Sequence, residues 1–289
     1  MISVYNVCGT IFMCDSAEGG FGRLQDDNGQ TANEGGVRMG NDQEMGMDGL
    51  VNGSIKIQET VAEKSANTRA LQRWNVIHSV CGRAQVQYDD WLETFQGAIA
   101  RCQTPIIDLG CGSGNDTLYL IERGKRVIAC DYAQNAIRNI RKNFPEVERA
   151  VCFDMAEGLP FGEDLTDLVI CDLSLHYFTE QTTFAILDEI KRVLRPGGLL
   201  LFRVNSVRDV NHGAGMGREV EHHLYETQEW GYKRYFDLHD INKFWGAWDQ
   251  IYLQEEAMHR YELEKVLWKG AVVAGVSYSG CSSERTAFR

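Results

Sequence analysis

Two acidic residues and three alternating glycines form the pattern in this chain best suited to chemistry. Asp108 precedes Gly110, Gly112 and Gly114, and Asp131 ends the next apolar run. Alternating glycines let the backbone turn sharply and let a ligand approach without meeting a Cβ atom. A carboxylate at the tip of the second strand of such a unit can accept hydrogen bonds from both hydroxyls of a ribose. The pattern therefore predicts a site for a nucleoside-type cofactor.

A strand, a turn, a helix and a second strand are needed to position these residues. The apolar runs 105–107 and 127–130 predict the strands, and residues 116–123 suit a helix that ends at Gly124. Such a helix presents free N–H groups at the turn. The glycine spacing is G-x-G-x-G, whereas a dinucleotide site has G-x-G-x-x-G, and the preceding acid disfavours a polyphosphate. A nicotinamide-dependent dehydrogenase is therefore a disfavoured alternative.

The segment 108–114, with the sequence DLGCGSG, resembles the first motif of class I S-adenosylmethionine (SAM) dependent methyltransferases. The sequence LRPGG at 194–198, before an apolar strand, is a second mark of that family, and the resemblance covers roughly residues 88–273. It implies an α/β fold, with a Rossmann-like, doubly wound, seven-stranded, mostly parallel sheet whose last strand is antiparallel. It also implies SAM as the cofactor and methyl transfer as the activity.

The resemblance places the cofactor along the carboxyl ends of the strands. Asp108 and the glycine turn would hold the methionine end of SAM, Asp131 the ribose and Asp154 the adenine, although Asp154 could instead cap a turn. In the helical lead-in, Tyr88 and Trp74 are the aromatic residues best suited to attract a sulfonium cation. The residues expected to bind the cofactor are Tyr88, Asp108, Gly110, Cys111, Gly112, Gly114, Asn115, Asp131, Tyr132, Asp154, Met155, Asp172 and Leu173.

The segment 172–178, with the sequence DLSLHYF, follows the fourth predicted strand and separates subclasses of the family. Amino-methyltransferases of DNA and RNA carry Pro-Pro and an aromatic residue here to hold a flipped base. This chain has no proline between Pro160 and Pro196, and the segment resembles the small-molecule branch. His176 is the candidate general base, because its unperturbed pKa lies near neutrality. The alternative is that His176 only orients the loop.

The region 205–235 is polar and rich in glycine, which is typical of a lid or binding element. The residues expected to contact the acceptor are Tyr177, Arg203, Asn205, His222 and Tyr225. Arg203 could equally pair with nearby acids. No metal site is expected, because the adjacent histidines 222 and 223 should project apart on a strand or helix and no histidine pair lies at i, i+4.

Composition narrows the partners of this 289-residue chain. Its formal net charge of −12 argues against nucleic acid, because phosphate binding usually needs a basic face. No apolar run approaches the roughly 18 residues of a membrane span, and no signal peptide is evident. Nine cysteines without a C-x-x-C pair indicate a reducing cytoplasm. A small or medium-sized acceptor is therefore expected; its reacting atom (O, N or S) and the oligomeric state are left open.

Three segments are expected along the chain. Residues 1–53 hold eleven of the 29 glycines and are expected to form a flexible, disordered leader. The methyltransferase domain would span 54–276, with a helical lead-in at 54–104 and a substrate lid at 205–235, and 277–289 would be a loose tail. Periodicity predicts helices over 54–80, 88–100, 133–144, 182–194 and 240–248 and strands over 150–153, 168–171, 199–204, 250–255 and 266–273.

Two further alternatives are compatible with these residues. A noncatalytic SAM-binding protein could use the lid and the leader to recognise a partner. Metalloid methylation of the tellurite or arsenite kind is suggested by the cysteines. However, Cys111, Cys130, Cys152 and Cys171 lie in or beside apolar strands, where cysteine behaves as a small hydrophobic residue.

Overall fold

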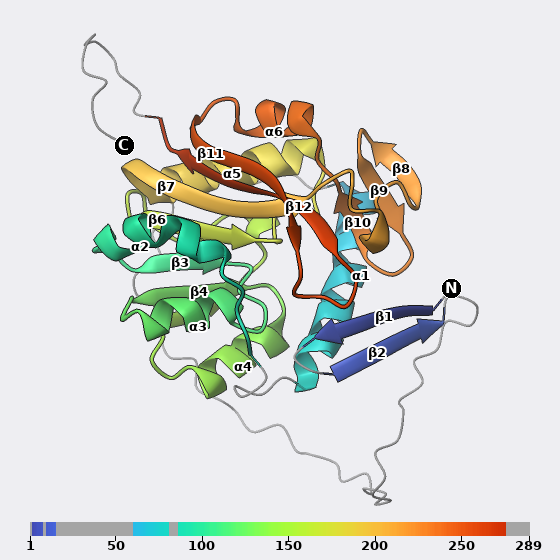
Figure 1. The fold of residues 1–289 in the computed structure, drawn as a ribbon, viewed down its shortest axis with the longest axis horizontal. Helices are drawn as coiled ribbons and strands as arrows, with labels where there is room; N and C mark the ends of the chain where they lie inside the picture. The colour runs from blue at the N-terminus through green and yellow to red at the C-terminus, as the bar shows by residue number, and fades with distance from the viewer. Residues whose placement is uncertain (1, 8–9, 16–59, 81–85, 276–289) are drawn as a thin grey trace, which may run out of the picture.

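A seven-stranded sheet forms the middle layer of the protein, and helices cover both of its faces (Figure 1). The computed structural model describes residues 2–7, 10–15, 60–80 and 86–275. The strand order is β11-β12-β7-β6-β3-β4-β5; the strands from β7 to β5 are parallel, and β12 is antiparallel to both of its neighbours. The strands are β3 (Ile106–Leu109), β4 (Val127–Asp131), β5 (Arg149–Cys152), β6 (Thr166–Asp172), β7 (Leu194–Asn205), β11 (Asp249–Met258) and β12 (Lys265–Val273). This arrangement confirms the predicted Rossmann-like sheet.

The central strands are apolar because helices bury both of their faces. One face packs against α5 (Glu180–Val193) and α6 (Leu238–Trp245), and Phe202 of β7 stacks on Trp245 at 4.1 Å between ring centroids. The opposite face is covered by α2 (Gln96–Arg101), α3 (Asn115–Glu122) and α4 (Gln134–Asn143), and the 3-10 turn η3 (Trp91–Phe95) precedes α2. The helix predicted over 88–100 is thus a 3-10 turn that passes into a short α-helix.

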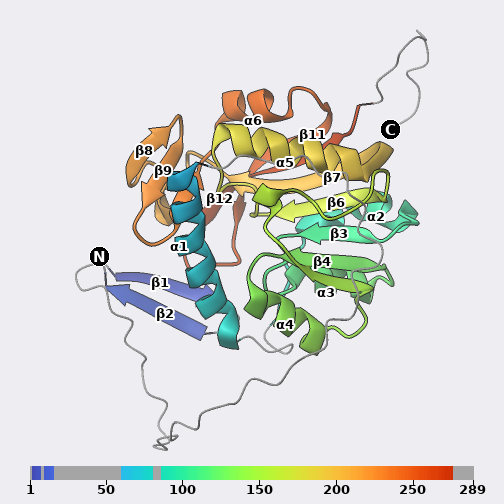
Figure 2. The ribbon, with the colours of Figure 1, turned by 180° about the vertical axis from the view of Figure 1, so that it is seen from behind.

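The helical lead-in begins with α1 (Val61–Ile77), which lies against α4 and β10 (Figure 2). Thr60 caps its first turn by accepting a hydrogen bond from Glu63 N at 3.1 Å. The 3-10 turn η1 (His78–Val80) follows α1 directly. The start predicted at residue 54 lies outside the described residues.

The lid region is not an irregular loop. The strands β8 (Arg218–Glu221), β9 (Leu224–Thr227) and β10 (Gly231–Arg234) form a separate antiparallel sheet beside α1 (Figure 2). Gly231 has φ +66°, and a Cβ atom on it would lie 2.2 Å from Ala66 O. Only glycine therefore lets the lid pack so closely on α1.

The first residues also contain strands. β1 (Ile2–Val7) and β2 (Thr10–Asp15) pair as an antiparallel hairpin within the segment 1–53 that was expected to be a flexible leader. Residues 2–15 include β-branched and aromatic residues, which favour strands. The glycine-rich composition of 1–53 as a whole hides this local preference. Residues 16–53 of the expected leader and the expected tail 277–289 lie outside the described residues. Within the described part of the chain, no helix combines the length and apolarity needed to span a membrane.

Candidate active site

The turn between β3 and α3 has the backbone that the glycine pattern predicted. Gly110 has φ +85°, and a Cβ atom there would lie 2.3 Å from Ser174 Cβ. Gly114 caps α3 with φ +93°, and a Cβ atom there would lie 2.7 Å from Phe144 Cε2. Gly112 has φ +51° but meets no atom within 3.4 Å. Two glycines are therefore required by their neighbours, and the third by its backbone angle.

Asp131, at the tip of β4, is tied to this turn. Its Oδ2 accepts a hydrogen bond from Gly112 N at 2.9 Å, and its Oδ1 accepts one from Ala133 N at 2.8 Å. Burial raises the pKa of Asp131, while the nearby His78 and the backbone donors oppose that rise. Two backbone hydrogen bonds therefore hold the carboxylate beside the glycine turn, and its binding of a ribose stays a prediction.

Two aromatic rings from the lead-in cover the turn. His78 Nδ1 lies 3.2 Å from Ser113 Oγ, and the Trp74 ring stacks on His78 with centroids 5.3 Å apart. Asn139 of α4 donates to His78 O at 2.5 Å and so holds the end of the lead-in beside the glycine turn. Trp74 was favoured from the sequence, but His78 was missed because it lies beyond the apolar face of the helix.

The structure does not bring Tyr88 to the glycine turn. Its ring packs edge-on against Tyr119 at 5.2 Å, and its hydroxyl donates to Glu122 near the end of α3. The apolar surface of α3 thus takes the ring that was expected to cover a sulfonium group. Asn115, which was expected to bind the cofactor, begins α3 directly after the turn, and its Nδ2 donates to Gln87 O at 2.6 Å.

Buried acids lie below the turn. Asp108 accepts a hydrogen bond from Thr117 Oγ1 at 2.6 Å, and Asp116 accepts one from Trp91 Nε1 at 3.0 Å. Burial, with the charge of Asp172, raises the pKa of Asp108 to about 7 against the effect of Thr117. Burial likewise raises the pKa of Asp116. A cation placed here would favour the ionised forms of both acids.

A buried ion-pair network neighbours these acids. Arg203 binds Asp172 through two hydrogen bonds of 2.6 and 2.7 Å and Asp89 through one of 2.8 Å; Arg260 lies 3.1 Å from Asp89 and 3.3 Å from Asp172. Burial acts to raise the pKa of Asp172, but the two arginines outweigh it and lower the value. A cavity of about 370 Å³, lined by 87–91, Arg203 and 256–260, opens against the network. The guanidinium group of Arg203 donates its hydrogen bonds to Asp172 and Asp89. The expectation that Arg203 contacts the acceptor is therefore not supported.

The predicted adenine side lies along β4 and β5. Asp154 Oδ1 accepts from Ala156 N at 2.9 Å and caps the 3-10 turn η4 (Met155–Glu157), which is the alternative role considered for it. Asp154 and Met155 remain half-buried, as does Tyr132 at the end of β4. Burial raises the pKa of the Tyr132 phenol, and the charge of Asp154 adds to this effect. Capping therefore leaves one Asp154 oxygen for a ligand.

Leu173 and the buried cysteines line the same strand ends. Leu173 has φ +53°, and its N–H donates to Arg203 O at 3.0 Å, which directs the chain after β6. Cys111, Cys130 and Cys171 are buried, and burial raises the pKa of each thiol. Protonated, buried thiols are poor ligands for a metalloid, so these cysteines give no support to metalloid chemistry.

His176 and Tyr177 follow β6 and lie next to the lead-in. Their rings are 4.2 Å apart, and Tyr177 meets Trp74 edge-on at 6.5 Å. Burial lowers the pKa of His176, with added effect from Lys233 and Lys265, so the ring is neutral at pH 7 but a weak base. Its Nδ1 has no hydrogen-bond partner among the described residues.

Lys233 gives this side a positive charge that the sequence analysis missed. Its Nζ donates to His212 O at 2.9 Å. Burial and the charge of Lys265 lower the pKa of Lys233 to about 7, against the opposing effect of Asp209. Lys265 itself is paired with Asp209 at 2.6 Å. Of these two lysines, Lys233 is therefore the one whose amine has no carboxylate close to it among the described residues.

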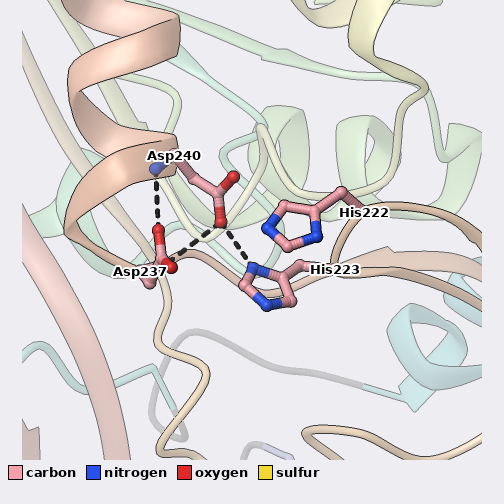
Figure 3. Close-up of side chains that lie close together, drawn as sticks. All are labelled: His222, His223, Asp237 and Asp240. Carbon is pink, nitrogen blue, oxygen red and sulfur yellow. Dashed lines mark hydrogen bonds and ion pairs between the residues drawn. The ribbon is translucent and has the colours of Figure 1, made fainter.

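The other expected acceptor contacts are dispersed. Tyr225 packs edge-on against the ring of Tyr235, and Lys233 lies over that same ring. The Tyr235 hydroxyl donates to His212 O. The Tyr235 ring therefore separates Tyr225 from Lys233. Asn205 is fully buried, and its Nδ2 donates weakly to Arg234 O at 3.4 Å. His222 is exposed in the β8–β9 turn, beside the start of α6 (Figure 3). Asn205 and His222 are therefore not placed with Tyr177.

Comparison with known proteins agrees with the fold and the glycine turn. Residues 107–202 match a family model described as a methyltransferase domain. Residues 107–202 form a methyltransferase domain. The segment that matches this domain family includes the glycine turn, Asp131, Asp154 and His176, but neither the lead-in nor the lid.

Relatives of the methyltransferase domain act on different acceptors. The chain is 36% identical over 109 residues to a tRNA N(3)-methylcytidine methyltransferase of Drosophila melanogaster, covering 34% of this chain and 33% of that one. It is 33% identical over 101 residues to a trans-aconitate 2-methyltransferase of Azoarcus sp., covering 34% and 38%. The chain thus spans less than half the length of the curated relatives it matches.

A solved structure is similar over most of the fold. The 1,6-didemethyltoxoflavin-N1-methyltransferase of Burkholderia thailandensis, solved with its substrate and S-adenosylhomocysteine, has a TM-score of 0.51 and 20% identity. The match covers 77% of this chain and 94% of that one. At this identity the similarity establishes the fold.

Proposed function

We propose that this protein binds SAM between the β3–α3 turn and the Trp74–His78 cover and transfers its methyl group to a small, anionic acceptor. The observation that carries the proposal is the hydrogen bond from Gly112 N to Asp131, which joins the glycine turn to a ribose-binding carboxylate. The methyltransferase family match over 107–202 supports the same cofactor.

The charges around the turn suit the donor. SAM carries a sulfonium and an ammonium group, and Asp108 and Asp116 offer buried carboxyl groups beside the turn. The Trp74 ring can attract the sulfonium cation, an interaction of about 0.5–2 kcal/mol depending on its desolvation. The ribose would lie on Asp131, and the exocyclic amine of adenine on Asp154.

The acceptor is the finer part of the proposal. Lys233 presents a half-buried ammonium whose pKa is lowered to about 7, and a bound anion would raise that pKa again. His176 and Tyr177 lie between this lysine side and Trp74. A carboxylate acceptor fits this arrangement. The trans-aconitate 2-methyltransferase among the relatives is named for a carboxylate substrate.

The chemistry needs alignment more than proton transfer. A lone pair on a carboxylate oxygen attacks the methyl carbon, and the carbon–sulfur bond breaks with its electron pair remaining on sulfur. The products are a methyl ester and S-adenosylhomocysteine, and no proton has to leave the acceptor. We therefore assign His176 a positioning role through its unpaired Nδ1 rather than the role of general base. Alignment and exclusion of water supply the rate.

Labelled methyl transfer tests this function. The protein is incubated with methyl-labelled SAM and a cell extract separated into small-molecule, RNA and protein fractions. We expect label in the small-molecule fraction, in a product whose mass and alkaline lability identify a methyl ester. Label in RNA would overturn the acceptor class, and SAM binding without any labelled product would overturn the enzymatic role. SAM and S-adenosylhomocysteine, but not NAD, should raise the melting temperature.

A further inference from the structure

Four side chains that can bind a metal ion meet where the turn between β8 and β9 approaches the start of α6. His222 and His223 form the turn between β8 and β9, and Asp237 and Asp240 begin α6 (Figure 3). One ligand atom from each of the four residues lies within 4.8 Å of all the others. His222, which the sequence analysis expected to contact the acceptor, lies here instead, and the other three residues were given no role in binding the cofactor or the acceptor.

The backbone of the turn explains why two adjacent histidines face the same way. His223 has φ +56°, in the left-handed region that non-glycine residues adopt rarely. The turn brings its ring onto that of His222, with centroids 3.8 Å apart and an angle of 29°. Adjacent histidines would diverge on a regular strand, so the sequence rule that excluded a metal does not apply here.

The two carboxylates are already fixed in place. Asp240 N donates to Asp237 Oδ1 at 2.8 Å and Asp237 N donates to Asp240 Oδ2 at 3.1 Å, so the two residues form a capping box. His223 Nδ1 lies 2.7 Å from the same Asp240 Oδ2, which leaves room for one proton between them. The capping box explains why the two acids lie here and why one of them pairs with His223. It does not explain why the His222 ring lies beside them.

We propose that His222, His223, Asp237 and Asp240 bind one Zn²⁺ ion that fastens the lid to α6. Imidazole nitrogen and carboxylate oxygen are ordinary zinc ligands, and four of them complete a closed, tetrahedral structural site. Zinc would take the place of the proton between His223 and Asp240. Zinc bonds of about 2.0–2.1 Å require the ligand atoms to contract to roughly 3.3 Å from one another. The exposed His222 can make that movement.

The consequence is a cross-link between two parts of the fold. The turn that holds both histidines belongs to the three-stranded lid sheet, and α6 packs on the central sheet. A bound ion would hold the β8–β9 turn of the lid in one position against α6. This inference does not rest on the proposed methyl transfer, because it concerns the lid alone.

Zinc titration of the full chain tests the site. The protein, stripped of metal with EDTA, is titrated with Zn²⁺ against a chromogenic chelator, and its melting temperature is measured with and without the ion. We expect one equivalent bound and a higher melting temperature with zinc. The variant His222→Ala should bind zinc at least tenfold more weakly and lose the shift. Because no hydrogen bond of the His222 ring is present in the described structure, the variant should melt normally in EDTA.

His239→Ala is the matched control, because His239 is an exposed histidine on the first turn of α6 and lies outside the cluster. It should bind zinc as the unchanged protein does. Equal loss in both variants would show adventitious binding to surface histidines and overturn the site. Undiminished binding by His222→Ala, or no binding by the unchanged protein, would overturn it as well.

Discussion

An Asp131→Asn variant should lose most of its affinity for SAM while it keeps its fold. The two carboxylate oxygens of Asp131 accept from Gly112 N and Ala133 N at 2.9 and 2.8 Å, and their remaining lone pairs would receive the ribose hydroxyls. Asparagine has one acceptor oxygen and turns an NH₂ group toward one of those N–H donors. A hydrogen bond to a charged group contributes about 1.5–3 kcal/mol. We therefore expect the Kd to rise by about 10- to 150-fold.

Calorimetric titration with both SAM and S-adenosylhomocysteine measures this loss. Both ligands carry the ribose, but only SAM carries the sulfonium charge, so the two should weaken by the same factor. Asp188→Asn, on the exposed face of α5, is the matched control and should bind as the unchanged protein does. A loss confined to SAM would mean that Asp131 acts on the cation, and an unchanged Kd in a folded variant would refute the assignment.

Three further substitutions test the reasoning elsewhere. The folded-state pKa of Asp108, about 7, lies above the ordinary 3.8, so its stabilising contribution is complete below pH 4 and is lost as the pH rises to 7. Relative to Asp108→Asn, the unchanged protein should thus lose up to about 4 kcal/mol of unfolding free energy over that range in chemical denaturation; a constant difference would contradict this. Gly110→Ala combines left-handed backbone strain with a contact of 2.3 Å to Ser174, whereas the Cβ atom of the control Gly124→Ala would meet nothing within 4 Å. Gly110→Ala should therefore destabilise the folded protein by about 2 kcal/mol more than Gly124→Ala. Equal melting temperatures of the two variants would contradict this. Lys233→Met should raise the KM for the acceptor at least tenfold and leave the Kd of SAM unchanged, and the reverse pattern would remove Lys233 from the acceptor side.

The sequence predicted the sheet well because buried parallel strands are continuous apolar runs. The strand expected over 168–171 is the centre of β6, and the glycine turn follows β3 where the spacing placed it. Asp131 could be located at the tip of β4 because an acid that ends an apolar run has a local signature. Such features depend on neighbours in the sequence, and the sequence therefore contains them directly.

The features that were missed depend on contacts between distant segments. The pKa of Lys233 is lowered by burial in the folded chain and by the charge of Lys265, and Arg203 binds Asp89, which lies 114 residues away. Tyr88 was expected at the turn because its position along the chain was suitable. The direction of its ring is decided by Tyr119 on α3, which no local pattern reveals.

The distribution of charge around the proposed site gives the proposed reaction a direction. Buried acids lie on the proposed donor side, where Asp108 and Asp116 would face the sulfonium cation, and Lys233 lies on the proposed acceptor side, where an anion would bind. Methyl transfer from a sulfonium to a carboxylate turns one cation and one anion into two neutral groups. A site of low dielectric constant favours a transition state in which these charges are being neutralised. The products therefore present less charge to the acids and the lysine than the substrates do. The same acids and lysine consequently bind the products more weakly than the substrates.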